Sequence, residues 1–510
     1  MPFRREIVVP AVLFLAVAAV GLAPGKAEEL APRSTVVGDE VAVPTREPAI
    51  EEMIAGDLFK DMKDPAAIYA AACADCHGKN MEGNKAQSLT DGVWQFGARR
   101  YQVRDNIQFG LAQLAMPAYD DSLTMDQLNA LTDYILSAES KAEPEPVVLP
   151  ATYTVGDQNV HIETVLDGFG EPWCFRFADE HLALLTDQES GELWQIVDGK
   201  QMDKPVANLP YAPDRGTGGL MDVAVGQTYA EDGWVYLCYA HLPDGEGKDV
   251  NKVASLPRVV RGHIQDNRWT DEEVILEARS EDYIMRGGSF GGRMLLPPDG
   301  YLYVTFGDRF EVDDAQDLTK PNGKIHRVHP DGRIPDDNPF VGQKGVYESI
   351  YTLGNRNAQG LALEPATGRI WETEHGPMGG DELNLIQAGH NYGWPRITYG
   401  REYDGRQITD HVTEDGLDQP QLYWNPSIAV CGLEFYSGDL FPQWKGQLLV
   451  GALKFQQLRR VKIDSDGEVV EEQVILKNFG RVRDVTTGPD GAIYVVLNKP
   501  GRVVKLTPAE

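Results

Sequence analysis

The run Asp299-Gly300-Tyr301-Leu302-Tyr303-Val304 joins a tight-turn dipeptide to alternating large apolar residues, the pattern of a strand that follows a turn. Runs of this shape recur after Pro150, and they begin at His181, Trp234, Tyr301, Arg369, Gln447 and Ala492. Six recurrences at irregular but similar intervals predict an all-β six-bladed propeller with insertions. A tandem of β-sandwiches has similar strands and stays the alternative. Propellers bind ligands in loops around one end of the central channel, so we expect the functional residues to lie in these loops.

Length and composition limit the class of protein. The 510 residues exceed what one hydrophobic core supports, so at least two domains are expected. With 42% hydrophobic residues and 52 glycines, the chain is globular and rich in turns. A net charge of -31 repels nucleic acid and anionic lipid surfaces, whereas a small neutral substrate is indifferent to it.

The N-terminus has the three-part layout of a secretory signal. Arg4 and Arg5 precede an apolar run over residues 7–23, and small residues end near Ala27. We therefore expect a signal peptide over 1–27, a leader over 28–60 and a periplasmic location. Because the run is slightly long, an uncleaved membrane anchor is the alternative. No later segment is apolar enough to span a bilayer, so no membrane contact is expected once the signal is removed.

The sequence Cys73-Ala-Asp-Cys76-His77 is the attachment signature of c-type haem. The two thiols add to the haem vinyl groups, and the adjacent imidazole becomes the proximal iron ligand. Met116 is the first candidate for the sixth ligand, because Ala115-Met116-Pro117 precedes the last helix, as in the small class I cytochromes c that this segment resembles. Met81 and Met125 are the alternatives.

The haem signature lies in a segment of helical texture, so we predict a small all-α cytochrome c domain over 61–140. Thr124 and Gln127 resemble a capping box, after which apolar residues repeat at helical spacing. A proline- and charge-rich linker is expected over 141–151, and the propeller over 152–510.

Several motifs in residues 152–508 resemble the soluble aldose (glucose/sorbosone) dehydrogenase family, six-bladed quinoproteins that bind pyrroloquinoline quinone and calcium. The motifs are Gly218-Gly219-Leu220-Met221-Asp222, Gly291-Gly292-Arg293, Gly354-Asn355-Arg356-Asn357-Ala358-Gln359-Gly360, Glu374-His375-Gly376-Pro377, Gly380-Asp381-Glu382-Leu383-Asn384, Asn391-Tyr392-Gly393-Trp394-Pro395 and Arg481-Val482-Arg483-Asp484-Val485.

The resemblance assigns cofactor roles to five residues. The quinone carries three carboxylates, which require fixed cations and planar guanidinium groups. The resemblance gives that task to Lys454, Arg481 and Arg483. Arg356 and Asn357 match the pair that reaches the quinone oxygens, where Arg356 would stabilise negative charge and so act in catalysis.

The resemblance also implies two calcium sites. Calcium binds oxygen ligands, including backbone carbonyls. The carbonyls of Gly376 and Pro377 match those that hold the ion beside the quinone, and Glu382 and Tyr392 match ligands of a structural calcium.

The chain departs from the family at the reactive end. Family members carry, four residues before the arginine that matches Arg293, a histidine that takes the substrate's hydroxyl proton; this chain has Ser289 there. A serine hydroxyl is too weak a base to act alone. Asp308 matches the carboxylate that orients the histidine, so we expect Asp308 to be the base, directly or through water and Ser289. Thr217 stands where relatives usually carry a glutamine beside the cofactor.

These residues predict an oxidoreductase. It would oxidise a sugar, a sugar aldehyde or a related alcohol, and pass electrons through its own haem to a downstream cytochrome or other respiratory acceptor. A propeller that binds quinone or sugar without turnover is the alternative, motivated by Ser289. A haem-and-propeller reductase of another kind would leave the arginine and Glu-His-Gly-Pro motifs unexplained.

Five further residues are assigned neither to the reaction nor to a cofactor. His375 is interpreted as structural, and Trp424 is equally compatible with the core and with an apolar wall of a substrate site. Cys174, Cys238 and Cys431 allow at most one disulfide, and their pairing is open.

Overall fold

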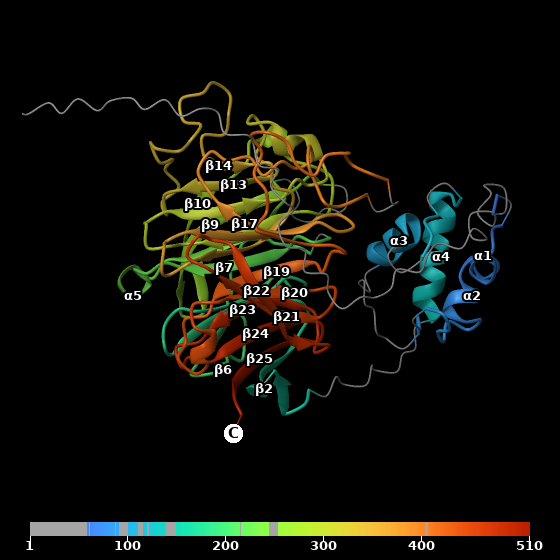
Figure 1. Ribbon diagram of the computed structural model, residues 1–510, viewed down its shortest axis with the longest axis horizontal. Coiled ribbons are helices and arrows are strands. Elements are labelled where there is room, and N and C mark those ends of the chain that lie inside the picture. Colours follow the sequence, from blue (N-terminus) through green and yellow to red (C-terminus); the bar gives the residue numbers. More distant parts are fainter. Residues whose placement is uncertain are drawn as a thin grey trace, which may run out of the picture. The chain divides into compact units, whose positions relative to one another are not determined.

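The computed structural model describes residues 59–60, 62–86, 88–90, 100–110, 116–119, 122–138, 149–156, 158–214, 216–243, 253–402 and 406–509. The predicted signal peptide, nearly all of the leader and most of the linker lie outside these residues. The N-terminal helices and the sheets are described separately below (Figure 1).

The described part of the predicted cytochrome domain contains four helices: α1 (Pro65–Ala72), α2 (Ala74–His77), α3 (Arg100–Phe109) and α4 (Met125–Ala138). The predicted haem signature lies at α2. Asp64 caps α1 by accepting a 3.0 Å hydrogen bond from the Ala66 N–H, and Pro65 occupies its first turn. The capping box of α4 is confirmed. Thr124 N–H donates to Gln127 Oε1 at 2.8 Å, and Gln127 N–H donates back to Thr124 Oγ1 at 3.3 Å.

Apolar side chains from these helices form one core. It contains, among others, Ile68, Cys73, Val103, Leu128 and Leu131. Within the described residues, every helix is too short or too polar to cross a bilayer.

The remaining chain forms six antiparallel sheets. The first five are β3 (Pro172–Phe177), β4 (Leu182–Asp187), β5 (Glu192–Val197) and β6 (Lys200–Gln201); β7 (Leu220–Val225), β8 (Val235–His241), β9 (Leu256–Gln265) and β10 (Arg268–Leu276); β11 (Gly291–Leu295), β12 (Leu302–Phe306), β13 (Lys324–Val328) and β14 (Ile350–Leu353); β15 (Ala358–Leu363), β16 (Ile370–Glu374), β17 (Asp381–Ile386) and β18 (Leu422–Trp424); and β19 (Val430–Phe435), β20 (Leu448–Ala452), β21 (Gln457–Ile463) and β22 (Val469–Lys477). Short helices in the connections are α5 (Tyr229–Asp232), η3 (Ser280–Asp282), η4 (Val312–Gln316) and η5 (Pro442–Trp444).

The sixth sheet joins the two ends of the propeller. Its strands are β1 (Thr152–Val155), β2 (Gln158–Phe169), β25 (Gly501–Pro508), β24 (Ile493–Asn498) and β23 (Val482–Thr487), in that spatial order. Strand β2 pairs antiparallel with β25, with Ile162 opposite Leu506, and both side chains are buried. The first long strand and the last strand therefore complete one blade together.

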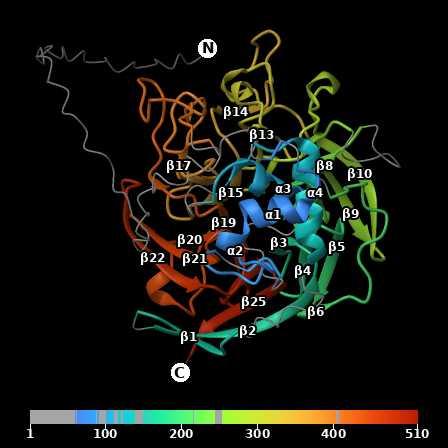
Figure 2. The same cartoon turned by 90° about the vertical axis from the view of Figure 1, so that its right-hand side faces the viewer.

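The sheets close into a six-bladed propeller. The innermost strands β3, β7, β11, β15, β19 and β23 each contact the next, and β23 contacts β3. Figure 2 shows the blades following one another around a circle. This closed ring confirms the predicted architecture and excludes the sandwich tandem. The six alternating runs are the second strands of the blades, β4, β8, β12, β16, β20 and β24.

Buried charges link the inner strands. The guanidinium of Arg293 on β11 lies 3.2 Å from Asp222 on β7 and 3.3 Å from Asp484 on β23. Asp484 also binds Arg176 of β3 at 2.6 Å. Pairing of this kind satisfies groups that would be costly to bury alone. These ion pairs join four blades.

Candidate functional site

Strand direction brings most of the predicted site residues to one end of the propeller. Ser289, Arg356 and Arg481 come just before the inner strands of three blades. Asp308 and Lys454 come just after second strands. Because first and second strands are antiparallel, the start of one and the end of the other meet at the same edge of a blade.

The central observation is a buried contact between Ser289 and Asp308. The Ser289 hydroxyl donates to Asp308 Oδ1 at 2.5 Å, and the Asp308 side chain is fully buried. The same oxygen accepts the Phe310 N–H at 3.1 Å. The residue in the histidine position and the expected base are thus in direct contact, and no bridging water is needed.

Two further contacts fix Asp308. Its Oδ2 accepts a 2.9 Å hydrogen bond from Trp394 Nε1, and its own N–H donates to the Arg356 carbonyl at 2.7 Å. Both carboxylate oxygens are therefore occupied by donors. The Ser289 hydroxyl is one of these donors.

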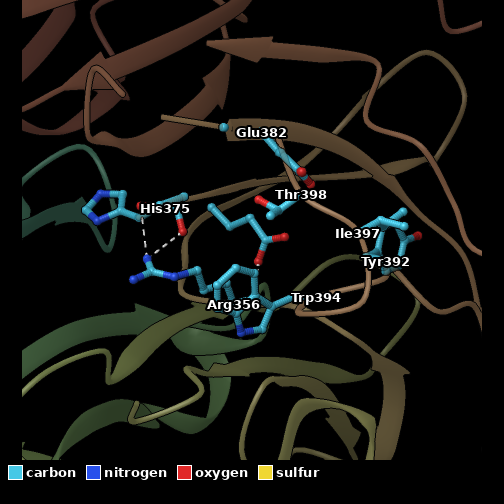
Figure 3. A pocket seen from close by; sticks show the side chains of 10 residues that line it. Arg356, His375, Glu382, Tyr392, Trp394, Ile397 and Thr398 are labelled. Atoms are coloured by element: carbon cyan, nitrogen blue, oxygen red, sulfur yellow. Dashed lines mark hydrogen bonds between the residues drawn. The ribbon is translucent and has the colours of Figure 1, made fainter. Parts of the chain in front are cut away.

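Arg356 and Asn357 face the same region from the next blade. Arg356 Nη1 donates to the carbonyls of His375 and Gly376 at 2.9 and 3.0 Å, as the dashed lines in Figure 3 show. The Asn357 side-chain oxygen accepts the Gly291 N–H at 3.0 Å. Arg356 thus reaches the Gly376 carbonyl that the resemblance gives to calcium.

The loop after β16 requires its glycine. A Cβ on Gly376 would lie 2.0 Å from the Gly379 carbonyl oxygen, so a side chain at this position would clash with the loop. The Gly376 N–H donates to Asp381 Oδ1 at 3.0 Å, which fixes the loop further. Gly376 and Pro377 are accordingly held with little freedom beside Arg356.

The predicted cation cluster is partly buried. Arg483 Nη1 lies 3.0 Å from Gln359 Oε1, and Arg483 Nε is buried with no hydrogen-bond partner in the described part of the chain. Burial lowers the pKa of Lys454 to about 8, against the raising effect of Asp381. An orphaned guanidinium nitrogen and a buried amine fit an anionic ligand.

His375 and Cys431 lie beside these cations. Burial first, and then the charges of Arg483 and Arg356, lower the pKa of His375 to about 3, so the imidazole is neutral at physiological pH. Its Nε2 lies 3.9 Å from Cys431 Sγ, which in turn lies 3.4 Å from Arg483 Nη1. A neutral histidine packed in this way agrees with the structural interpretation.

A small pocket lies beside Arg356, and its lining includes Glu374, Glu382 and Tyr392. In Figure 3, Glu382 and Arg356 lie on opposite sides of it. Burial raises the pKa of Glu382 to about 7, with a smaller contribution from Asp381. The carboxyl groups that line this pocket are therefore costly to ionise unless a cation neutralises them.

A third carboxyl group, Glu372 on β16, belongs to the same cluster. Asn384 Nδ2 bonds Glu372 at 3.1 Å and Glu382 at 3.3 Å. Glu372 Oε1 and Asn384 Oδ1 are buried without hydrogen-bond partners among the described residues. Burial raises the pKa values of Glu372 and Glu374 well above the usual range. Carboxylate and amide oxygens are the ligand types of a hard cation such as calcium, but within the described residues no three Asp, Glu, His or Cys side chains are grouped closely enough to hold a metal ion.

The haem signature occupies one helical turn. Cys76 and His77 N–H both bond the Cys73 carbonyl, at 3.1 and 2.9 Å. Both cysteines are free thiols, as thioether attachment requires. Met116 and Met81 belong to the hydrophobic cluster around Cys73.

Met125, in contrast, opens α4 and is 50% exposed. The structure thus favours Met116 or Met81, and the sixth ligand stays a prediction.

The other open residues are now placed. Trp424 is buried in the core and donates to Glu472 Oε1 at 2.8 Å, which supports the core interpretation. Cys174, Cys238 and Cys431 are separate buried thiols. Thr217 lies near Ser289, because its N–H donates to the Gly287 carbonyl at 2.9 Å.

Sequence reasoning missed three contributors. Trp394 lies in the motif Asn391-Tyr392-Gly393-Trp394-Pro395, but its hydrogen bond to Asp308 joins residues that are 86 positions apart in the sequence. Glu372 had only its alternation with Glu374 as a signal. Phe310 had no signal beyond following Gly307-Asp308-Arg309.

Comparison with known families decides the identity of the propeller. A family model described as glucose/sorbosone dehydrogenase matches residues 169–505. The chain belongs to this family. A second model, for subunit III of cbb3-type cytochrome c oxidase, matches residues 60–135. The chain thus combines a family propeller with a c-type cytochrome domain.

Individual relatives agree with both assignments. Aldose sugar dehydrogenase YliI of Escherichia coli is 36% identical over 71% of this chain and 96% of its own length. The apo crystal structure of the soluble aldose sugar dehydrogenase from Escherichia coli matches 69% of this chain and 100% of its own, with a TM-score of 0.64. Residues of the cytochrome segment are 38% identical to the FixP subunit of cbb3-type oxidase from Azorhizobium caulinodans, over 14% of this chain and 26% of that one.

Proposed function

We propose that this protein is a periplasmic quinohaemoprotein dehydrogenase. It oxidises an aldose, a sugar aldehyde or a related alcohol with pyrroloquinoline quinone and calcium, and passes the electrons to its own haem c. The named relatives that are aldose sugar dehydrogenases support the substrate class. The c-type cytochrome domain on the same chain supports the acceptor.

The observation that carries the proposal is the Ser289–Asp308 contact at the end of the propeller that also carries Arg356. Ser289 Oγ accepts the substrate's hydroxyl proton while its own proton passes to Asp308 Oδ1. The carboxylate supplies the basicity that a serine lacks. When bound, the quinone supplies the two-electron acceptor for the hydride that leaves the substrate carbon. Arg356 provides a fixed positive charge at this end.

The charges and oxygen atoms described above indicate which residues would hold each cofactor. Lys454, Arg481 and Arg483 would hold the carboxylates of the quinone, and Asn357 would contact its oxygens. The carbonyls of Gly376 and Pro377 would hold calcium beside it. Glu382, with Tyr392, would hold a structural calcium.

Export to the periplasm rests on the N-terminal signal pattern. A mature protein that begins near residue 28, measured by intact mass, is the expected result. A mature protein that retains Arg4 and Arg5 would contradict cleavage and favour an anchor.

The test of function uses the oxidised, haem-loaded protein with calcium. Aldoses, sugar aldehydes and simple alcohols are added with and without pyrroloquinoline quinone, and the absorption of reduced haem is followed. At least one substrate should reduce the haem only when quinone is present.

The control is an Asp308→Asn protein with the same haem content. Tight quinone binding by the wild-type protein without haem reduction by any compound would instead support the alternative of binding without turnover.

A further inference from the structure

Phe310 is held in an unusual conformation beside the Ser289–Asp308 pair. Its φ is 61°, and the preceding Arg309 has a φ of 55°. The left-handed region is costly for residues with a Cβ, particularly bulky ones, and such strain gathers at functional sites. The Phe310 side chain is nevertheless 40% exposed. The strained backbone therefore presents an aromatic ring to solvent instead of burying it.

Buried contacts of Arg309 hold this backbone. The Arg309 side chain is fully buried, and its guanidinium lies 3.5 Å from the centre of the Phe290 ring. It also donates to the Ser255 carbonyl at 3.3 Å and to the carbonyls of Gly288 and Arg286. These contacts fix the chain directly before Phe310.

Gly288 fixes where the ring lies. A Cβ on Gly288 would be 2.5 Å from Phe310 Cε2, so the ring rests directly on this glycine. Gly288 is the neighbour of Ser289, and the Phe310 N–H bonds the same Asp308 oxygen as the Ser289 hydroxyl. The ring thus borders the group that would accept the substrate proton.

An exposed ion pair flanks the ring. Arg286 Nε lies 3.0 Å from Glu311 Oε1, and the two side chains are 55% and 44% exposed. The surface formed by Phe310, Arg286 and Glu311 therefore offers an aromatic face together with hydrogen-bond donors and acceptors.

This combination matches the chemistry of a pyranose ring. One side of the sugar presents C–H bonds that suit the negative face of an aromatic ring, and its edge presents hydroxyls. Binding sites commonly pair an apolar wall with a few polar groups that fix orientation.

We propose that Phe310, with the Arg286–Glu311 pair, is a saccharide platform that binds the C–H face of an aldopyranose and places its C1 hydroxyl at Ser289. This inference rests on the proposed dehydrogenase function and names a specificity-determining element of its site. The platform selects for cyclic sugars over short acyclic aldehydes and alcohols, because only a sugar ring covers the aromatic face.

Two variants test the platform in the protein loaded with haem, calcium and quinone. Phe310→Leu removes the aromatic face at an exposed position, and Gly288→Ala displaces the ring without altering it. We expect each to raise KM for an aldopyranose about tenfold with little change in kcat, and to leave KM for glyceraldehyde unchanged.

Tyr301→Leu is the matched control. Tyr301 precedes β12, at the opposite end of the strand that leads to Asp308, so this exchange should leave both KM values unchanged. An unchanged KM for the aldopyranose in Phe310→Leu, or an equal rise for both substrates, would overturn the platform.

A binding measurement separates this proposal from the dehydrogenase function. Saturation-transfer NMR with methyl β-D-glucopyranoside needs no turnover, and saturation transfer to its ring C–H protons should be much weaker in Phe310→Leu than in the wild-type protein.

Suppose that the wild-type protein turns over no sugar, and that saturation transfer is much weaker in Phe310→Leu than in the wild-type protein. These two results together would support the platform and refute the dehydrogenase function. Normal turnover with the same transfer in both proteins would refute the platform alone.

Discussion

At the scale of single residues, the proposed proton relay rests on the hydrogen bond between Ser289, which stands in the histidine position, and Asp308. Ser289 and Asp308 are both buried, and both oxygens of Asp308 accept hydrogen bonds, one of them from the Ser289 hydroxyl. Sequence comparison locates both residues. Only the fold shows that they touch, and that Trp394 holds the second oxygen.

The relay predicts similar losses from two substitutions. Asp308→Asn should lower kcat by about 10²–10⁴-fold, the usual range for a general base, while KM changes little. Ser289→Ala should lower kcat nearly as far, and the double variant should be no worse than the worse single one, because the two residues act as a unit. Steady-state kinetics on protein of matched haem content provides the measurement. Near-normal kcat in Ser289→Ala would show that Asp308 acts without the serine.

Lys454 gives a prediction about pH. Burial lowers its pKa to about 8, so the side chain is charged below that pH and neutral above it. Affinity for the quinone carboxylates should be constant below pH 7 and about tenfold weaker at pH 9, since about a tenth of the amine is then protonated. Titration of quinone binding by fluorescence at several pH values measures this.

Two exchanges at Lys454 serve as controls. Lys454→Arg should remain charged and bind equally well at pH 7 and 9. Lys454→Gln should bind weakly at both. A wild-type affinity that stays constant from pH 7 to 9 would show that Lys454 does not contact the carboxylates.

At the scale of elements, the hairpin β16–β17 concentrates four buried carboxyl groups, Glu372, Glu374, Asp381 and Glu382. The strand pairing sets Glu374 opposite Glu382 and Glu372 opposite Asn384. Side chains directly opposite each other on a sheet are in contact, and like charges there are unfavourable. The hairpin is therefore stable at neutral pH when protons or a cation neutralise it.

Removal of calcium should weaken the propeller. Calcium at about 100 times its Kd adds about 2.7 kcal/mol to the free energy of unfolding, so a chelator should lower the Tm of the propeller by several degrees. Glu372→Gln should raise the Tm of the chelated protein and reduce its response to added calcium.

Scanning calorimetry at fixed pH provides the measurement, and Glu163→Gln, an exchange at an exposed position of β2, is the control. An identical calcium response in Glu372→Gln and the wild-type protein would place the ion away from this hairpin.

The elements also show what sequence periodicity can detect. Second strands were predicted because they alternate after turn dipeptides, as in Tyr301-Leu-Tyr-Val. Inner strands such as β11 (Gly291–Leu295) are buried on both faces and rich in glycine, so they carry no alternation. The pairing of β2 with β25 joins residues more than 300 positions apart, a distance that local patterns do not encode.

At the scale of the whole molecule, one chain carries both a propeller of the glucose/sorbosone dehydrogenase family and a c-type cytochrome domain. The haem signature and the family motifs were readable from sequence, because each chemistry needs specific residues at fixed spacing. Phe310 and Glu372 were not, because their importance comes from the backbone and neighbours that the fold supplies.

Electrons should pass from the propeller to the haem within one molecule. In rapid mixing of an aldose with protein loaded with haem, calcium and quinone, the first-order rate of haem reduction should not change when the protein is diluted tenfold. A rate that falls in proportion to protein concentration, or quinone-bound protein whose haem stays oxidised, would contradict the claim that this propeller reduces its own cytochrome.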